Sequence, residues 1–131
     1  MRDLEVAISS ASHPVEVWSA QARAALENLR AVVDHHIFAT EAAGGFLDEI
    51  VETSPRLANS AHRLREEHGE IVDALSAASA RLRAGPSLDS DDWTDVMRDR
   101  LLALLAMLSR HRQRGADLVY EAYDVDIGNA G

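Results

Sequence analysis

Three histidines, His36, His68 and His111, stand on helical stripes of apolar residues, where leucine would be the ordinary choice. In such a stripe, apolar residues recur at alternating steps of three and four, which places them on one face of a helix. A buried imidazole needs a hydrogen-bond partner, and imidazole is the commonest metal ligand in proteins. These positions therefore point to a metal site, with a hydrogen-bonded core histidine as the alternative at each of them.

Three long helical patterns must position the histidines, and no stretch keeps the two-residue alternation of a strand. The first begins after Pro14, and its stripe is Trp18, Ala22, Ala25, Leu29, Val32, His36, Thr40 and Ala43. The second covers about residues 55–84, and its stripe is Leu57, Ala61, Leu64, His68, Ile71, Leu75, Ala78 and Leu82. The third covers about residues 91–123, and its stripe is Met97, Leu101, Leu104, Leu108, His111, Gly115, Leu118 and Ala122.

Glycine, proline and small polar residues predict where these helices begin and end. The pair Gly44-Gly45 either breaks the first helix or is carried within it at a cost of ~1 kcal/mol for each glycine. Ser54-Pro55 predicts an N-cap and a first helical position, and Gly85-Pro86 predicts the end of the second helix. Asp89 or Ser90 is expected to cap the third helix. The pattern as a whole predicts an all-α fold, an up-down bundle of three long helices plus a short N-terminal arm or helix.

Hairpin geometry predicts that the three histidines meet. Short connections make consecutive helices antiparallel neighbours, so residues equally far from a turn lie side by side. His36 and His68 are each 16 residues from Glu52, and His68 and His111 flank the midpoint of the second turn. All three should therefore lie at one level, roughly 24 Å from the first turn at about 1.5 Å per residue. The three histidines share this level if the first helix continues through Gly44-Gly45, or nearly so.

A carboxylate is expected beside the histidines, because three neutral imidazoles leave a di-iron centre short of negative charge. Glu41 is the first candidate, since the hairpin places it near His62, one layer closer to the first turn. Asp117 and Glu121 on the third helix are further candidates, and both could equally be solvated. Gly115, one turn after His111, would leave room for a ligand or water, or would allow close helix packing.

The bulk properties of the chain exclude several other functions. Its 131 residues predict one domain, 1–131, with an arm over 1–12 and a loose tail over 124–131. A net charge of −9 argues against nucleic-acid binding, which needs a cationic surface. The absence of cysteine excludes disulfides and thiolate metal sites. No apolar run approaches ~18 residues and no signal peptide is visible, so we expect no membrane span and a cytoplasmic protein.

Short motifs around the histidines resemble those of a known family. They are the pair His36-x4-Glu41, the segment 63–68 that ends in His68, and the segment 111–118 that begins with His111. Over about residues 18–122 the chain resembles the hemerythrin-like (HHE cation-binding) helical bundles. The resemblance implies a non-haem iron site, mononuclear or di-iron, that binds dioxygen, senses oxygen or redox state, or handles nitric oxide or peroxide. It implies His36, His68 and His111 as ligands and Glu41 as a carboxylate ligand or a residue that orients one.

The sequence departs from the usual set of that family, which is five histidines and two carboxylates on four long helices. His13, His35 and His62 do not fall on the stripes, and a fourth long helix is missing. The N-terminal arm or a second subunit could supply that helix. A single metal, an atypical pair of metals and no metal all remain open.

Two other classes of function compete with metal binding. His62, one residue off the stripe, is followed by Arg65 as in histidine-phosphotransfer domains, but Glu66 replaces their glycine and would repel a phosphoryl group. The other class is a metal-free interaction bundle. Its apolar surface would come from residues in excess of a three-helix core, namely Trp18, Ile37, Phe38, Phe46, Leu47 and Trp93. Such a surface would cover the arm or a partner, and a homodimer would complete a four-helix layout, so we predict a homodimer.

Overall fold

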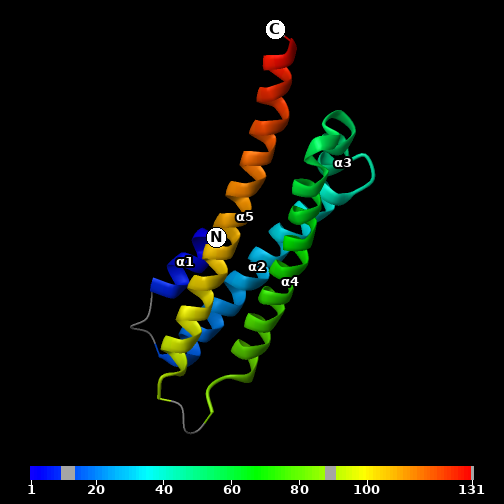
Figure 1. Cartoon of the computed structure of the whole chain (residues 1–131). Helices are drawn as coiled ribbons and strands as arrows, with labels where there is room; N and C mark the ends of the chain where they lie inside the picture. The colour runs from blue at the N-terminus through cyan, green and yellow to red at the C-terminus, as the bar shows by residue number, and fades with distance from the viewer. Residues whose placement is uncertain (10–13, 88–90, 131) are drawn as a thin grey trace.

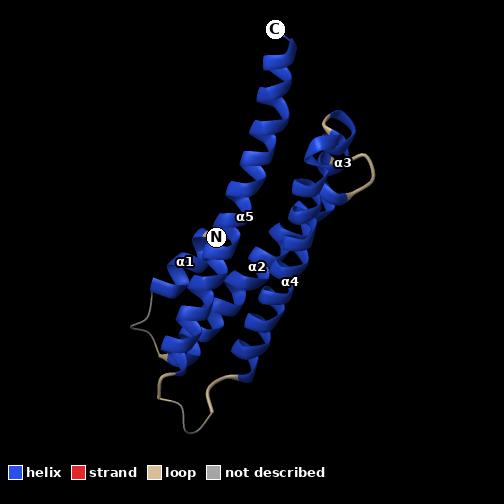
Figure 2. Cartoon of the chain, viewed as in Figure 1, coloured by secondary structure: helices blue, strands red, loops and turns tan. Residues whose placement is uncertain are grey.

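The computed structural model describes residues 1–9, 14–87 and 91–130, with the backbone alone for 124–130. All its regular elements are helices, and the described residues contain no strand (Figure 2). They are α1 (Arg2–Ser9), α2 (Val15–Glu41), α3 (Phe46–Thr53), the short 3-10 helix η1 (Pro55–Leu57), α4 (Ala58–Ala84) and α5 (Trp93–Ala130). The all-α prediction is therefore confirmed. No helix in these ranges is both long enough and apolar enough to cross a bilayer.

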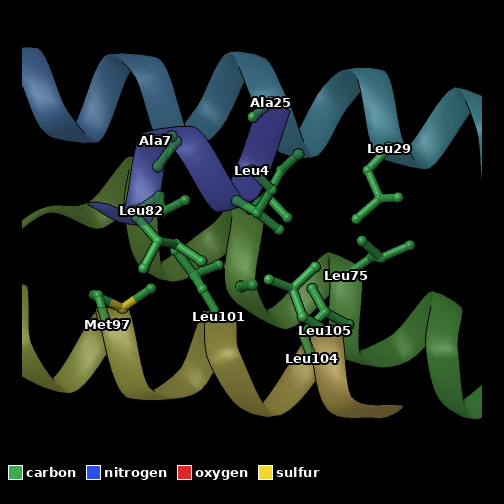
Figure 3. Close-up of a cluster of buried hydrophobic side chains, with 14 of the residues drawn as sticks. Leu4, Ala7, Ala25, Leu29, Leu75, Leu82, Met97, Leu101, Leu104 and Leu105 are labelled. Atoms are coloured by element: carbon green, nitrogen blue, oxygen red, sulfur yellow. The ribbon is translucent and has the colours of Figure 1, made fainter. Parts of the chain in front are cut away.

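The long helix α4 packs against both α2 and α5, and the short helix α1 packs against α2 (Figure 1). Figure 3 shows α1 between α2 and α5, with Leu4 pointing into the core. The arm expected over residues 1–12 is thus helical from Arg2 to Ser9, and it buries Leu4, Ala7 and Ile8. Because α1 has only 8 residues, it covers one end of the long helices and leaves the other end uncovered.

The core consists of two clusters with the histidines between them. The first joins α1, α2, α4 and α5, and the second joins α3, η1, α4 and α5. On α4, Leu64 belongs to the second cluster and Ile71 to the first, with His68 between them. On α5, His111 stands likewise between Leu108 and Leu118. The histidine level is therefore a polar layer between two apolar ones.

The predicted stripes hold on two of the three long helices. On α4 every residue of the stripe is buried, and on α5 every residue except the half-buried Gly115. On α2 the stripe turns after Leu29, because Val33 is buried while Val32 is 66% exposed. From Leu29 the buried face advances by steps of four, through Val33 to the partly buried Ile37. Either of the two adjacent valines, Val32 or Val33, could have continued the buried stripe, and packing against the other helices buries Val33.

The glycine pair breaks the first helix, which was one of the two alternatives that the sequence left open. Helix α2 ends at Glu41, and Gly44 has φ +75°, a left-handed conformation that favours glycine. A Cβ on Gly45 would lie 2.8 Å from the carbonyl oxygen of Ala42, so a side chain there would collide with backbone. Asp48 of α3 holds the turn by accepting hydrogen bonds from the Gly44 N–H at 3.1 Å and from Arg65 of α4 at 2.6 Å.

Other predicted boundaries hold in part. Pro55 occupies the first helical position after Ser54, but the buried Ser54 side chain forms no capping hydrogen bond. Gly85, at φ +70°, follows the last residue of α4 as predicted. The backbone of α5 is helical to Ala130. The loose tail expected over 124–131 stays a prediction. His13 and the capping candidates Asp89 and Ser90 lie outside the described residues.

A leucine pair tests the packing of α1. We expect Leu4→Ala to lower the free energy of unfolding by about 2–3 kcal/mol, since Leu4 is 1% exposed and its loss leaves a cavity. The same substitution at Leu102, which is 49% exposed, should change it by no more than about 0.5 kcal/mol. Denaturant unfolding of both variants provides the measurement. Equal effects at the two positions would show that α1 does not pack as described.

Candidate metal centre

The three histidines predicted to meet do lie together. His36 comes from α2, His68 from α4 and His111 from α5, and one ligand nitrogen from each lies within 4.8 Å of the others. The ring centroids are 5.2 Å apart for His36 and His68, 5.6 Å for His36 and His111, and 4.8 Å for His68 and His111. Among the described residues, no other group of histidine, aspartate and glutamate side chains comes together in this way.

The three rings differ in burial. His68 and His111 are 4% and 8% exposed, as their stripes predicted. His36 was predicted to point inward, but its side chain is exposed, because the buried face of α2 has turned toward Val33. Its ring still reaches both others from the rim. The cluster therefore has two buried imidazoles and one that is open to solvent.

Glu41, the last residue of α2, hydrogen-bonds His68. Its Oε1 lies 3.0 Å from Nδ1 of His68, and an ionised carboxylate can only accept, so Nδ1 carries the proton. In that tautomer, Nε2 is the nitrogen of His68 that can bind a metal. Of the two roles considered for Glu41, the geometry supports orientation of a ligand. Glu41 was expected near His62, and its carboxylate contacts His68 instead.

Glu67 plays the same part for His111, and the sequence reasoning missed it. Its Oε1 lies 3.4 Å from Nδ1 of His111, and Nε of Arg114 lies 2.7 and 2.6 Å from its two oxygens. Glu67 is 7% exposed although it stands one position off the stripe of α4. A signal was present on α5, where Arg114 follows His111 by one turn and offers a cation to a buried acid on the facing helix.

The surroundings of His36 and His111 lower the pKa of both rings and so favour the neutral form, which is the form that binds metal. Burial lowers the pKa of His36, and the charges of His68 and His111 lower it further. Burial likewise lowers the pKa of His111, as does the charge of His68, and these effects outweigh the opposing pull of Glu67. Burial alone would raise the pKa of Glu67, but hydrogen bonds and charges from Arg114 and His111 hold it below its usual value.

These shifts predict that acid destabilises the metal-free protein. His36 and His111 have lowered pKa values in the folded state, so the unfolded chain binds more protons on these rings. The contribution of these two rings to stability is therefore fully present above the pKa of histidine in the unfolded chain, about 6.5. It is lost as the pH falls from there toward the pKa values in the folded state. Denaturant unfolding at pH 7.5 and at pH 5.5 is the measurement. His111→Gln should reduce the difference in unfolding free energy between the two pH values, and His62→Gln should retain it. An equal difference in both variants would show that the buried histidine is not its cause.

A cavity of about 420 Å³ opens over the histidine cluster. Its walls come from α2, α3, α4 and α5, and Met1 lines the end nearest α1. Gly115 also lines it, and a Cβ built there would meet nothing within 4 Å. The reading of Gly115 as room beside His111 is thus supported, and close helix packing at this glycine is not.

The remaining candidates do not join the cluster. Asp117 accepts a hydrogen bond from Gln113 on the exposed side of α5, and Glu121 is exposed. His35 is exposed. The side chain of His62 is 72% exposed, with Nε2 only 3.1 Å from Glu66, as the objection to phosphotransfer anticipated.

The apolar surface expected for an interaction bundle is largely covered by the chain itself. Trp18 is buried in the first core cluster, to which α1 contributes. Its ring meets that of Trp93 edge-on, with 6.1 Å between the ring centroids. Leu47 is buried and Phe46 half-buried around α3, and Phe38 alone of the six residues is fully exposed, at 74%. Packing within the chain thus accounts for much of the apolar excess, and the homodimer stays a prediction.

Comparison with known proteins adds no assignment. The chain matches no family model, no curated protein and no solved structure. The likeness to hemerythrin-like bundles therefore rests on the short motifs around the histidines. The function must be argued from the chemistry of the cluster itself.

Proposed function

We propose that this protein is a transition-metal-binding helical bundle in which His36, His68 and His111 hold one metal ion. The observation that carries the proposal is the convergence of three imidazole nitrogens, from three helices, within 4.8 Å. Nitrogens that share an ion lie no more than about 4.2 Å apart, twice a metal–nitrogen bond of about 2.1 Å. A small adjustment of the three rings, of which His36 is the exposed one, would bring all three nitrogens into this range.

The hydrogen bonds around the buried rings support the proposal. Nδ1 of His68 and Nδ1 of His111 are both engaged by carboxylates, which fixes the tautomer and leaves Nε2 as the donor atom. Among the described residues, the buried side-chain nitrogens and oxygens without a partner are Trp18 Nε1 and Arg98 Nε. Neither histidine Nε2 belongs to that set, and both histidines line the cavity. A carboxylate behind each ligating histidine is the usual support of a protein metal site.

The donor set favours one ion rather than two. Glu41 and Glu67 are each committed to a histidine, so neither is left to bridge a pair of metals. Imidazole suits iron, zinc, copper and nickel. Among these metals, the resemblance to hemerythrin-like proteins favours iron. It also favours an up-down-up bundle and a function in oxygen, redox or nitric oxide sensing or protection. Three ligands from the protein leave coordination positions for such a small molecule.

Elemental analysis tests the proposal directly. Protein expressed with iron, zinc, copper and nickel available should retain about one metal per chain after gel filtration, and the retained element identifies the metal. Iron-loaded protein kept reduced and then exposed to dioxygen or nitric oxide should change its visible spectrum if the sensing role holds. A stable, folded chain that takes up none of these metals would refute the metal site.

A further inference from the structure

The cavity over the histidines has room for more than a diatomic molecule. Its volume of about 420 Å³ lies in the range of roughly 300–1,000 Å³ typical of small-molecule sites. It extends to both sides of the histidine level, past Leu29 and Val33 toward Met1, and past Gly115 toward Phe46. Its walls are apolar except for the histidines, Thr40 and Arg112.

The size of the cavity argues for a small molecule rather than a helix of a partner. A helix with its side chains is about 10–12 Å across, so one turn of it would take up this volume. Met1, the residue before α1, lines the cavity as well, so its side chain takes up space that a partner helix would need. An occupant must therefore be short and slender.

The charge of the walls argues for an anionic head on that molecule. The chain carries 22 acidic residues, yet none of them lines the cavity. The charged side chain on its rim is Arg112, one residue after His111. Glu41 and Glu67, which hydrogen-bond the cluster, do not line the cavity and are paired with His68, His111 and Arg114. An anion at the mouth of the cavity would thus meet a cation and no facing acid.

We propose that this cavity binds a molecule with a slender apolar body and one carboxylate head, of the class of medium-chain monocarboxylates. The body lies along Leu29, Val33 and Ile71, and the head lies at the histidine level beside Arg112. The position of the head rests on the proposed metal, which would offer it a coordination site. The apolar body depends on the cavity alone.

Gly115 provides a test that leaves the fold intact. A Cβ at this helical glycine meets nothing, so Gly115→Leu should fold and fill the cavity with its side chain. Gly69 is the matched control, because it is a helical glycine of α4 with equally open space and an exposed position outside the cavity. Calorimetric titration with decanoate is the measurement, on protein whose metal content and sedimentation are determined in parallel.

Decanoate should bind the wild type and Gly69→Leu alike, and Gly115→Leu should bind it at least tenfold more weakly. Acetate, which offers the head alone, should bind at least 100-fold more weakly than decanoate, because apolar burial is lost with each methylene. Arg112→Ala should weaken decanoate several-fold. Equal binding by Gly115→Leu and wild type, with both folded, would overturn the proposal. So would a wild-type dimer that Gly115→Leu converts to monomer without any decanoate binding.

The same samples separate this inference from the metal site. Metal-loaded protein that does not bind decanoate would overturn the ligand proposal, and the metal proposal would be unaffected. Metal-free wild type that binds decanoate, with the same sensitivity to Gly115→Leu, would support the cavity ligand while the metal proposal fails.

Discussion

His68→Ala should reduce the metal content from about one ion per chain to near zero. His68 supplies one of three donor nitrogens, and its ring is held in place by Glu41, so the variant loses both the ligand and its orientation. The loss should exceed the 10–100-fold that removal of an outer carboxylate typically costs in affinity. Elemental analysis and competition with a chelator would measure it.

His62→Ala is the matched control on the same helix. His62 is exposed and contacts Glu66 rather than the cluster, so this variant should retain the metal. Circular dichroism should show that both variants remain helical, because the Glu41 side chain, 31% exposed, can turn to water when His68 is removed. Full metal content in His68→Ala would place the metal elsewhere.

Glu67→Ala should weaken both the fold and the metal site. Its carboxylate is 7% exposed and bonds His111 and Arg114 together, so its removal leaves the Nδ1–H of His111 without an acceptor. An orphaned buried polar group costs about 1–3 kcal/mol, and the lost side chain adds a small cavity, so we expect about 2–3 kcal/mol. Metal affinity should fall about 10–100-fold, because His111 is no longer oriented.

Glu66→Ala provides the neighbouring control. Glu66 precedes Glu67 on α4, its side chain is 63% exposed, and its contact is with the exposed His62. Its removal should change stability by no more than about 0.5 kcal/mol and should leave metal affinity unchanged. Glu67→Gln should have a stability and a metal affinity between those of Glu67→Ala and Glu66→Ala. Its amide oxygen can still accept a hydrogen bond from His111, but the charge that faces Arg114 is gone. Identical metal affinity in Glu67→Ala and wild type would contradict the orienting role.

The sequence determined the helices and most of their buried faces. The stripes of α4 and α5 could be predicted residue by residue because helical periodicity is a local property of the sequence. The meeting of the histidines was predicted from the turn midpoints. It survived the break at Gly44-Gly45 because His36 lies before the end of α2.

The tertiary structure decided what local pattern left open. Whether Val32 or Val33 is buried depended on neighbouring helices, and that choice put His36 on the rim rather than inside. The partnership of Glu67 with His111 needed α5 to face α4, which spacing along one chain segment does not encode. The cavity exists because α1 is too short to cover the whole length of α2 and α5. Contacts between distant segments set each of these outcomes, and the three histidines gain their chemical setting from them.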